Sequence, residues 1–252
     1  MAPTPPWPKG TAAAIARSLD IYYRDTDRTA RMDRLNAQFV RPGGLAFDIG
    51  AHLGDRTASF LRLGASVVAL EPQPAIYRAL RLLHGNNDSA VLTWSALGAE
   101  LGEVEIMVNS ANPTTSTASR AFVDAAQSAA AWKGQSWDQL IRTPMTTLDQ
   151  LIRDHGLPDF IKIDVEGHEL EVLRGLSQPV RALSYEFTTL QRDIALAALA
   201  RLADLGRYRF NLSLGEDHLL QFDDWVDAEI LADLITTIPE AANSGDIYAL
   251  QQ

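Results

Sequence analysis

The residues that first suggest chemistry are two acids, each at the end of an apolar run. Residues 46–54 read AFDIGAHLG, so Asp48 precedes a turn that carries Gly50 and Gly54. Residues 67–72 read VVALEP and place Glu71 at the end of the next apolar run. In a parallel α/β sheet, such a glycine turn lets the backbone approach a nucleoside, and the second acid accepts hydrogen bonds from the ribose hydroxyls. The pattern predicts a nucleoside site with Glu71 at the ribose.

This glycine turn differs from the turn that binds dinucleotides. The dinucleotide pattern G-x-G-x-x-G requires a glycine two positions after Gly50, and His52 stands there instead. Without that glycine the turn is poorly suited to a pyrophosphate. A turn of the form D-x-G-x-x-x-G suits a ligand without phosphate, such as S-adenosylmethionine (SAM).

Later apolar runs bring further carboxylates to the same region. FIKID (160–164) ends at Asp164, and Glu166 follows it closely. Because a sulfonium is a cation, its pocket is expected to contain carboxylates rather than positively charged side chains. We expect Asp48 to bind the methionine end of SAM, directly or through water, and Asp164 to contact the cofactor.

Methyl transfer to oxygen depends on positioning and is helped by a base for the acceptor hydroxyl. Glu166, His168 and Glu186 are the candidates for this base, because they lie near the edge where acceptor and methyl group should meet. Lys162 shares a strand face with Asp164 by the two-residue period of a strand. We expect an internal ion pair for Lys162 rather than a catalytic role.

The elements that must position these side chains alternate along the chain. Strands are expected at 45–49, 66–70, 90–95, 160–164, 182–187, 207–214 and 246–250, with an extra strand at 104–109. Helices are expected at 11–39, 54–63, 74–84, 147–156 (with Thr147 as the cap), 169–176, 190–205 and 223–237. This order predicts an α/β fold with a doubly wound, mostly parallel seven-stranded sheet, helices on both faces, and ligands at its carboxyl edge. Ser95 and Ala96 then end the third strand, where we expect backbone contacts with the adenine.

Residues 110–144 form a Ser/Thr/Ala-rich excursion between the third and fourth core strands. The excursion is too long for an ordinary connection. We expect it to be a mobile lid or an acceptor-side insertion. Trp132 and Trp137 within it either stack on a sugar or aromatic acceptor or anchor the lid to the body.

Composition narrows the function classes. The 252 residues carry a net charge of −10, which argues against a nucleic acid or an anionic membrane as partner. The chain has no cysteine, which excludes disulfides, thiolate zinc sites and cysteine nucleophiles. The other histidines are isolated, so no metal site is predicted, although the acids have the chemistry to host magnesium. No signal peptide or membrane span is apparent, so we expect a cytoplasmic protein, and a homo-oligomer is compatible with the sequence.

The chain resembles the FkbM family of SAM-dependent methyltransferases, which have the Rossmann-like class I methyltransferase fold. The similar segments are FDIGAHLGDRT (47–57), ALEPQP (69–74), TTLDQL (146–151), FIKIDVEGHELEVLRG (160–175) and YEF (185–187). The resemblance covers about residues 41–188. It implies an N-terminal helical extension at 1–40 and a methyltransferase domain at 41–252.

The resemblance also extends the expected site. It implies that the cofactor is bound by Asp48, Gly50, Ala51, His52, Gly54, Thr57, Glu71, Pro72, Ser95, Ala96 and Asp164. Family members often carry Asn at the position of His52. The implied activity is O-methylation, with hydroxyls of sugars, polyketides or other secondary metabolites as acceptors.

Two other function classes compete with this interpretation. An NAD-dependent oxidoreductase would use a similar sheet, but it is disfavoured by the glycine missing at position 52 and by the lack of any Tyr-x-x-x-Lys pair. A non-catalytic cofactor-binding module is disfavoured because none of the motifs looks eroded. A comparison of S-adenosylhomocysteine (SAH) binding with NAD binding separates the methyltransferase from the oxidoreductase.

Overall fold

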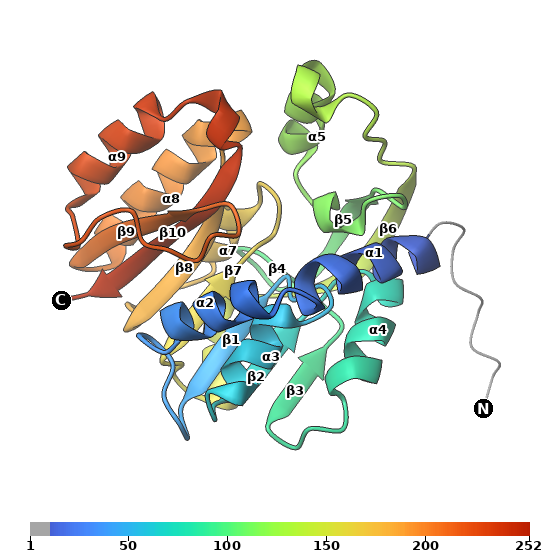
Figure 1. Cartoon of the computed structure of the whole chain (residues 1–252), viewed down its shortest axis with the longest axis horizontal. Helices are drawn as coiled ribbons and strands as arrows, with labels where there is room; N and C mark the ends of the chain where they lie inside the picture. Colours follow the sequence, from blue (N-terminus) through green and yellow to red (C-terminus); the bar gives the residue numbers. More distant parts are fainter. Residues whose placement is uncertain (1–10) are drawn as a thin grey trace.

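The computed structural model of the chain describes residues 11–252. These residues form a seven-stranded sheet with helices on both faces and a separate three-stranded sheet (Figure 1). The proline-rich start of the chain, part of the predicted N-terminal extension, lies outside the described residues. Among the helices of residues 11–252, none is long and apolar enough to cross a membrane.

The large sheet has the strand order β3-β2-β1-β7-β8-β10-β9. Its strands are β1 (Leu45–Ile49), β2 (Ser66–Leu70), β3 (Ala90–Thr93), β7 (Phe160–Ile163), β8 (Ala182–Thr188), β9 (Tyr208–Leu214) and β10 (Ser244–Gln251). Only β10 runs antiparallel to its neighbours in this sheet. The predicted mostly parallel α/β fold is confirmed, and β1 and β2 have the predicted bounds.

Helices cover both faces of this sheet because its strands are apolar on both sides. Phe47 and Ile49 belong to a buried cluster with residues of α6 (Leu148–His155), α7 (Glu169–Arg174), α8 (Arg192–Leu205) and α9 (Ala228–Thr237). Ala46 belongs to a second cluster with residues of α2 (Thr26–Asn36), α3 (Asp55–Arg62) and α4 (Pro74–His84). Since side chains alternate along a strand, Asp48 points to the same face as Ala46. As predicted, the hydroxyl of Thr147 caps α6, accepting from Gln150 N at 3.1 Å.

The N-terminal segment departs from the prediction of continuous helix. It forms two helices, α1 (Thr11–Tyr23) and α2, because the Asp25 carboxylate accepts a hydrogen bond from Arg28 N at 2.8 Å and starts a new helix. Ile15, Leu19 and Tyr23 pack against Leu53 and its cluster. Tyr22 lines a cavity.

The extra strand expected at 104–109 is present, but it belongs to a separate three-stranded sheet that was not predicted. This sheet has the order β4-β6-β5, with β4 (Ala96–Leu97), β5 (Gly102–Val108) and β6 (Gln139–Thr146). The predicted third strand therefore ends at Thr93, and Ala96 begins a strand of the second sheet. The excursion also contains α5 (Arg120–Ser128) and the 3-10 turns η1 (Pro113–Thr115) and η2 (Ala130–Trp132). Figure 1 shows β5, β6 and α5, in green, set to one side of the large sheet.

Candidate functional site

A cavity of about 370 Å³ lies at the carboxyl edge of the large sheet. Most of the predicted site residues line it: Asp48, Gly50, Ala51, His52, Glu71, Pro72, Ser95, Ala96, Asp164, Glu166, His168 and Glu186. Gly54 and Thr57 do not belong to the lining. The lining also includes Asp55, Arg56 and Gln73, which lie within the segments 47–57 and 69–74, and Tyr22, Trp132, Glu216, Asn243 and Ser244 from distant segments.

The turn after β1 has the backbone freedom that the sequence predicted. Gly50 has a φ of 81°, and a Cβ at this position would lie 1.8 Å from the carbonyl oxygen of Asp164. Only glycine permits this close approach of two strand ends. His52 also has a positive φ, of 49°, a conformation in which Asn, Asp and His are enriched among non-glycine residues. Burial lowers the pKa of His52 to about 4, so its ring is neutral at physiological pH.

Asp48 lies under this turn and is held by Thr57. The Asp48 side chain accepts a hydrogen bond from the Thr57 hydroxyl at 2.5 Å, and both residues are buried. Burial raises the pKa of Asp48 to about 6. Thr57 is fully buried and outside the cavity lining, and its hydroxyl orients Asp48. Its contact with the cofactor stays a prediction.

Glu71 is fixed by backbone donors at the end of β2. Its two carboxylate oxygens accept hydrogen bonds from His52 N at 3.0 Å and from Gln73 N at 2.8 Å. Only 2% of the residue is exposed, and this burial raises the pKa of Glu71 to about 7. Its neighbour Gln73 links the site to the excursion, because its amide donates to Pro113 O at 3.0 Å and accepts from Ser116 at 3.0 Å.

Ser95 lies between the two sheets. Its hydroxyl donates to the carbonyl of Pro144 at 3.0 Å and to that of Ala96 at 2.9 Å. The side chain is therefore engaged within the protein, and a backbone contact with the adenine at this position stays a prediction.

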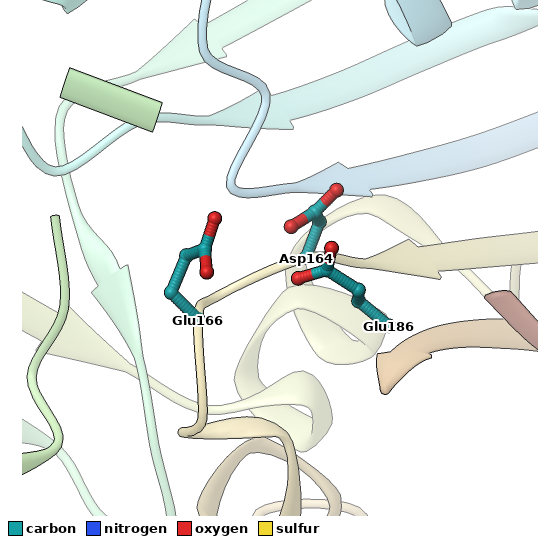
Figure 2. Close-up of side chains that lie close together, drawn as sticks. All are labelled: Asp164, Glu166 and Glu186. Atoms are coloured by element: carbon teal, nitrogen blue, oxygen red, sulfur yellow. The ribbon is translucent and has the colours of Figure 1, made fainter. Parts of the chain in front are cut away.

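Three carboxylates meet beyond the end of β7. Oxygens of Asp164, Glu166 and Glu186 lie within 4.8 Å of one another, and Figure 2 shows the three groups turned toward a common space. Glu166 and the following Gly167 both have a positive φ, which turns the chain sharply and aims Glu166 inward. Burial, followed by the nearby charge of Asp164, raises the pKa values of Glu166 and Glu186 well above their usual range.

These three carboxylates are also the groups of residues 11–252 that have the arrangement to hold a metal ion. Carboxylate oxygens are hard ligands of the kind that Mg²⁺ and Ca²⁺ prefer. The sequence-based expectation of no metal stays a prediction.

Lys162 forms the internal ion pair that its strand position predicts. Its Nζ lies 2.6 Å from Asp246 Oδ1 and 3.3 Å from Asp164 Oδ2. Burial opposes the charge of Lys162, but the two carboxylates outweigh burial and raise its pKa above the usual range. His168 precedes α7 and lines the cavity, and burial lowers its pKa.

The lining suits a cationic nucleoside. It includes the carboxylates Asp48, Asp55, Glu71, Asp164, Glu166, Glu186 and Glu216, against the strong bases Arg56 and Lys162. Lys162 is already neutralised by its two partners. A cavity rich in carboxylates, with a glycine turn and an acid at the end of β2, fits SAM, whose sulfonium is positively charged.

Comparisons with known proteins agree with this chemistry. A model of the methyltransferase FkbM domain matches residues 48–228. No curated protein matches the chain.

Several solved structures resemble the chain at low identity. Precorrin-6Y C5,15-methyltransferase from Geobacter metallireducens GS-15 is 13% identical with a TM-score of 0.46, over 91% of this chain and 90% of that one. A TehB-like SAM-dependent methyltransferase from Corynebacterium glutamicum is 10% identical with a TM-score of 0.46, over 96% of each chain. An O-methyltransferase from Bacillus cereus, solved with SAH, is 12% identical with a TM-score of 0.45, over 98% and 92%.

The family is shown by the match to the FkbM domain. That match spans most of the chain and includes the glycine turn, Glu71 and the carboxylate cluster. The protein belongs to the FkbM family of SAM-dependent methyltransferases.

Proposed function

We propose that the protein methylates a hydroxyl oxygen of a small molecule or a sugar. The observation that carries this proposal is the placement of Glu166 and Glu186 beside Asp164 in the cavity, with their pKa values raised. A carboxylate with a raised pKa is a stronger base once it is ionised, which suits it to accept the proton of a hydroxyl.

Six residues of the cavity have roles in this proposal. Glu71 accepts hydrogen bonds from the ribose, Asp48 faces the methionine end, and Asp164 faces the sulfonium. When bound, SAM supplies a methyl group on a sulfonium that leaves as the neutral thioether SAH. Glu166 accepts the proton that the acceptor hydroxyl loses, and Glu186 and His168 are the next candidates for that role.

We propose that the excursion 110–144 is the acceptor-side insertion of a methyltransferase domain at 41–252. Its η1 turn and Trp132 line the cavity, and the Trp132 ring packs edge-to-face on Phe122 with centroids 5.2 Å apart. The Trp132 ring therefore has a rigid support from which to stack on the sugar or other cyclic body of an acceptor.

A screen with labelled SAM against glycan and metabolite extracts tests the proposed activity. We expect label in a product in which a hydroxyl has become a methyl ether, and no label when that hydroxyl is blocked beforehand. Label on a nitrogen or carbon of the acceptor would contradict O-methylation while leaving the family assignment intact.

A further inference from the structure

Glu216 lines the cavity although it lies far along the chain from the recognised motifs. It follows β9 directly after Gly215, whose φ of 49° turns the chain back toward the start of α3. Its side chain is 47% exposed, so a ligand can reach it, and it is also paired with Arg28.

The contacts of Glu216 use one of its two oxygens. Oε2 accepts from Arg28 Nη2 at 2.5 Å and from Arg56 Nη2 at 3.2 Å, and it lies 3.2 Å from His218 Nε2. Among the hydrogen bonds and ion pairs of residues 11–252, Oε1 takes part in none. One oxygen is therefore fixed and the other is free to accept a hydrogen bond.

The groups that hold this oxygen are themselves fixed within the protein. The Arg28 side chain is 5% exposed and also donates to Asp55 Oδ2 at 2.8 Å, at the first residue of α3. Its guanidinium lies 5.1 Å from the centre of the Tyr22 ring, and Tyr22 lines the cavity. The α1–α2 pair and the turn after β9 are thus fastened together beside the glycine turn.

The Glu216 carboxylate is ionised at neutral pH. Burial alone would raise the pKa of Glu216, but Arg56, the hydrogen bond from His218 and Arg28 together hold it well below its usual range. An ionised carboxylate with an open oxygen recognises a cation that donates hydrogen bonds. A primary ammonium donates three hydrogen bonds, whereas a sulfonium has no N–H or O–H donor.

SAM carries such an ammonium at its methionine end. Along the carboxyl edge, β2 with Glu71 lies on one side of β1, and the glycine turn of β1 leads into α3, where Glu216 is held. If the ribose is at Glu71, as proposed above, the amino-acid end reaches the opposite part of the cavity. We infer that Glu216 binds the α-ammonium of SAM through Oε1, with Tyr22 covering that end of the cofactor.

Calorimetric titration without any acceptor tests this inference. The ligands are SAH, an SAH analogue that lacks the α-amino group, and 5′-methylthioadenosine, which lacks the whole amino-acid end. The wild-type protein is expected to prefer SAH over the deaminated analogue by about tenfold or more, the effect of a charged hydrogen bond. Glu216→Gln is expected to remove most of this preference and to leave 5′-methylthioadenosine binding unchanged. Glu171→Gln, at the exposed ion pair with Arg174, is the matched control and should change none of the three affinities.

Three results would overturn the inference. The first is a wild-type protein that binds SAH and the deaminated analogue equally, a result that needs no variant to fold. The second is a Glu216→Gln protein that binds SAH like the wild type. The third is an equal loss for SAH and 5′-methylthioadenosine, which would show that Glu216 acts only by supporting the wall of the cavity. Because no acceptor is present, a failed acceptor screen leaves this test unaffected.

Discussion

Lys162 and Asp246 form a buried ion pair that joins β7 to β10 across the intervening strand β8. Lys162 is in register with Asp48 and shares with it the sheet face covered by α2 and α3. Lys162 also reaches Asp164, so one buried cation holds a structural acid and a site acid together. The position of Asp164 thus depends on a strand at the far end of the chain.

We expect Asp246→Asn to destabilise the fold by about 3 kcal/mol, because it leaves Lys162 buried with Asp164 as its remaining partner. Urea unfolding in the absence of ligand measures this loss. Glu105→Gln, which breaks the exposed pair with Arg142, should cost at most about 1 kcal/mol. Equal effects of the two substitutions would show that the buried pair contributes no more than a surface pair.

Glu71→Ala is expected to weaken SAH binding by about 1.5–3 kcal/mol, the effect of a lost charged hydrogen bond. The carboxylate is already aligned by His52 N and Gln73 N, so little reorganisation opposes its contact with a ribose. Calorimetry on a variant whose circular dichroism matches the wild type measures the change. An unchanged SAH affinity would remove Glu71 from the ribose.

The pKa of Glu71, raised by burial to about 7, predicts a pH dependence. Below pH 7 the folded protein holds a proton that a ribose hydroxyl would have to displace, so SAH affinity should rise as the pH increases through 7. The stability of the free protein should change in the opposite direction. The unfolded carboxyl ionises near pH 4.5 and the folded one near 7, so between these values the folded state binds more protons and stability falls as pH rises.

Parallel measurements of SAH affinity and thermal unfolding between pH 5 and 8 check both signs. Glu71→Gln, which cannot ionise, should flatten the affinity profile in this range. A variant profile that still rises through pH 7 would assign the titration to another group, such as Asp48, whose pKa burial raises to about 6.

The predictable part of the fold is the part that is apolar on both faces. The β1 and β2 runs have no polar residue before Asp48 and Glu71 except Ser66, so their bounds and their acids could be located from sequence. Strand β6 escaped prediction because Pro144, which lacks an N–H, interrupts its pattern. Glu216 and Tyr22 escaped because their place in the cavity depends on contacts with Arg28, which no local spacing encodes.

The insertion offers a direct test of acceptor binding. Trp132→Ala is expected to raise the acceptor KM about tenfold and to leave SAH affinity unchanged, because Trp132 lines the cavity from the proposed acceptor-side insertion. Trp137 also packs on Phe122 but does not line the cavity, and its indole donates to Thr115 O at 2.8 Å. Trp137→Phe should therefore lower stability without selectively raising the acceptor KM.

If the insertion also moves, as its length suggests, limited proteolysis should cut within 110–144 in the free protein. SAH plus acceptor should then protect it. Equal resistance in every state would identify the segment as a fixed insertion, while the effect of Trp132→Ala would remain to be explained by stacking alone.

The turn from Asp164 to Gly167 gives the most specific prediction about the chemistry. Glu166 is aimed inward by its positive φ, and Thr117 donates to its carbonyl at 2.6 Å while Glu169 accepts from Gly167 N at 3.2 Å. Asp164→Asn should weaken SAM binding, because it removes a charge beside the sulfonium. Glu166→Gln should spare SAM binding and lower kcat by about 10²-fold or more, because it removes the base but keeps the shape.

Single-turnover rates with the acceptor found by the screen, together with SAM affinities, separate these two effects. In the wild type the rate should rise with pH, since a carboxyl whose pKa is raised must lose its proton before it can act, and Glu166→Gln should abolish that rise. If Glu166→Gln keeps full turnover, Glu186 or His168 becomes the next candidate. If a chelator stops turnover and Mg²⁺ restores it, the three carboxylates hold a metal ion, the prediction of no metal is wrong, and the loss in Glu166→Gln reports a missing ligand rather than a missing base.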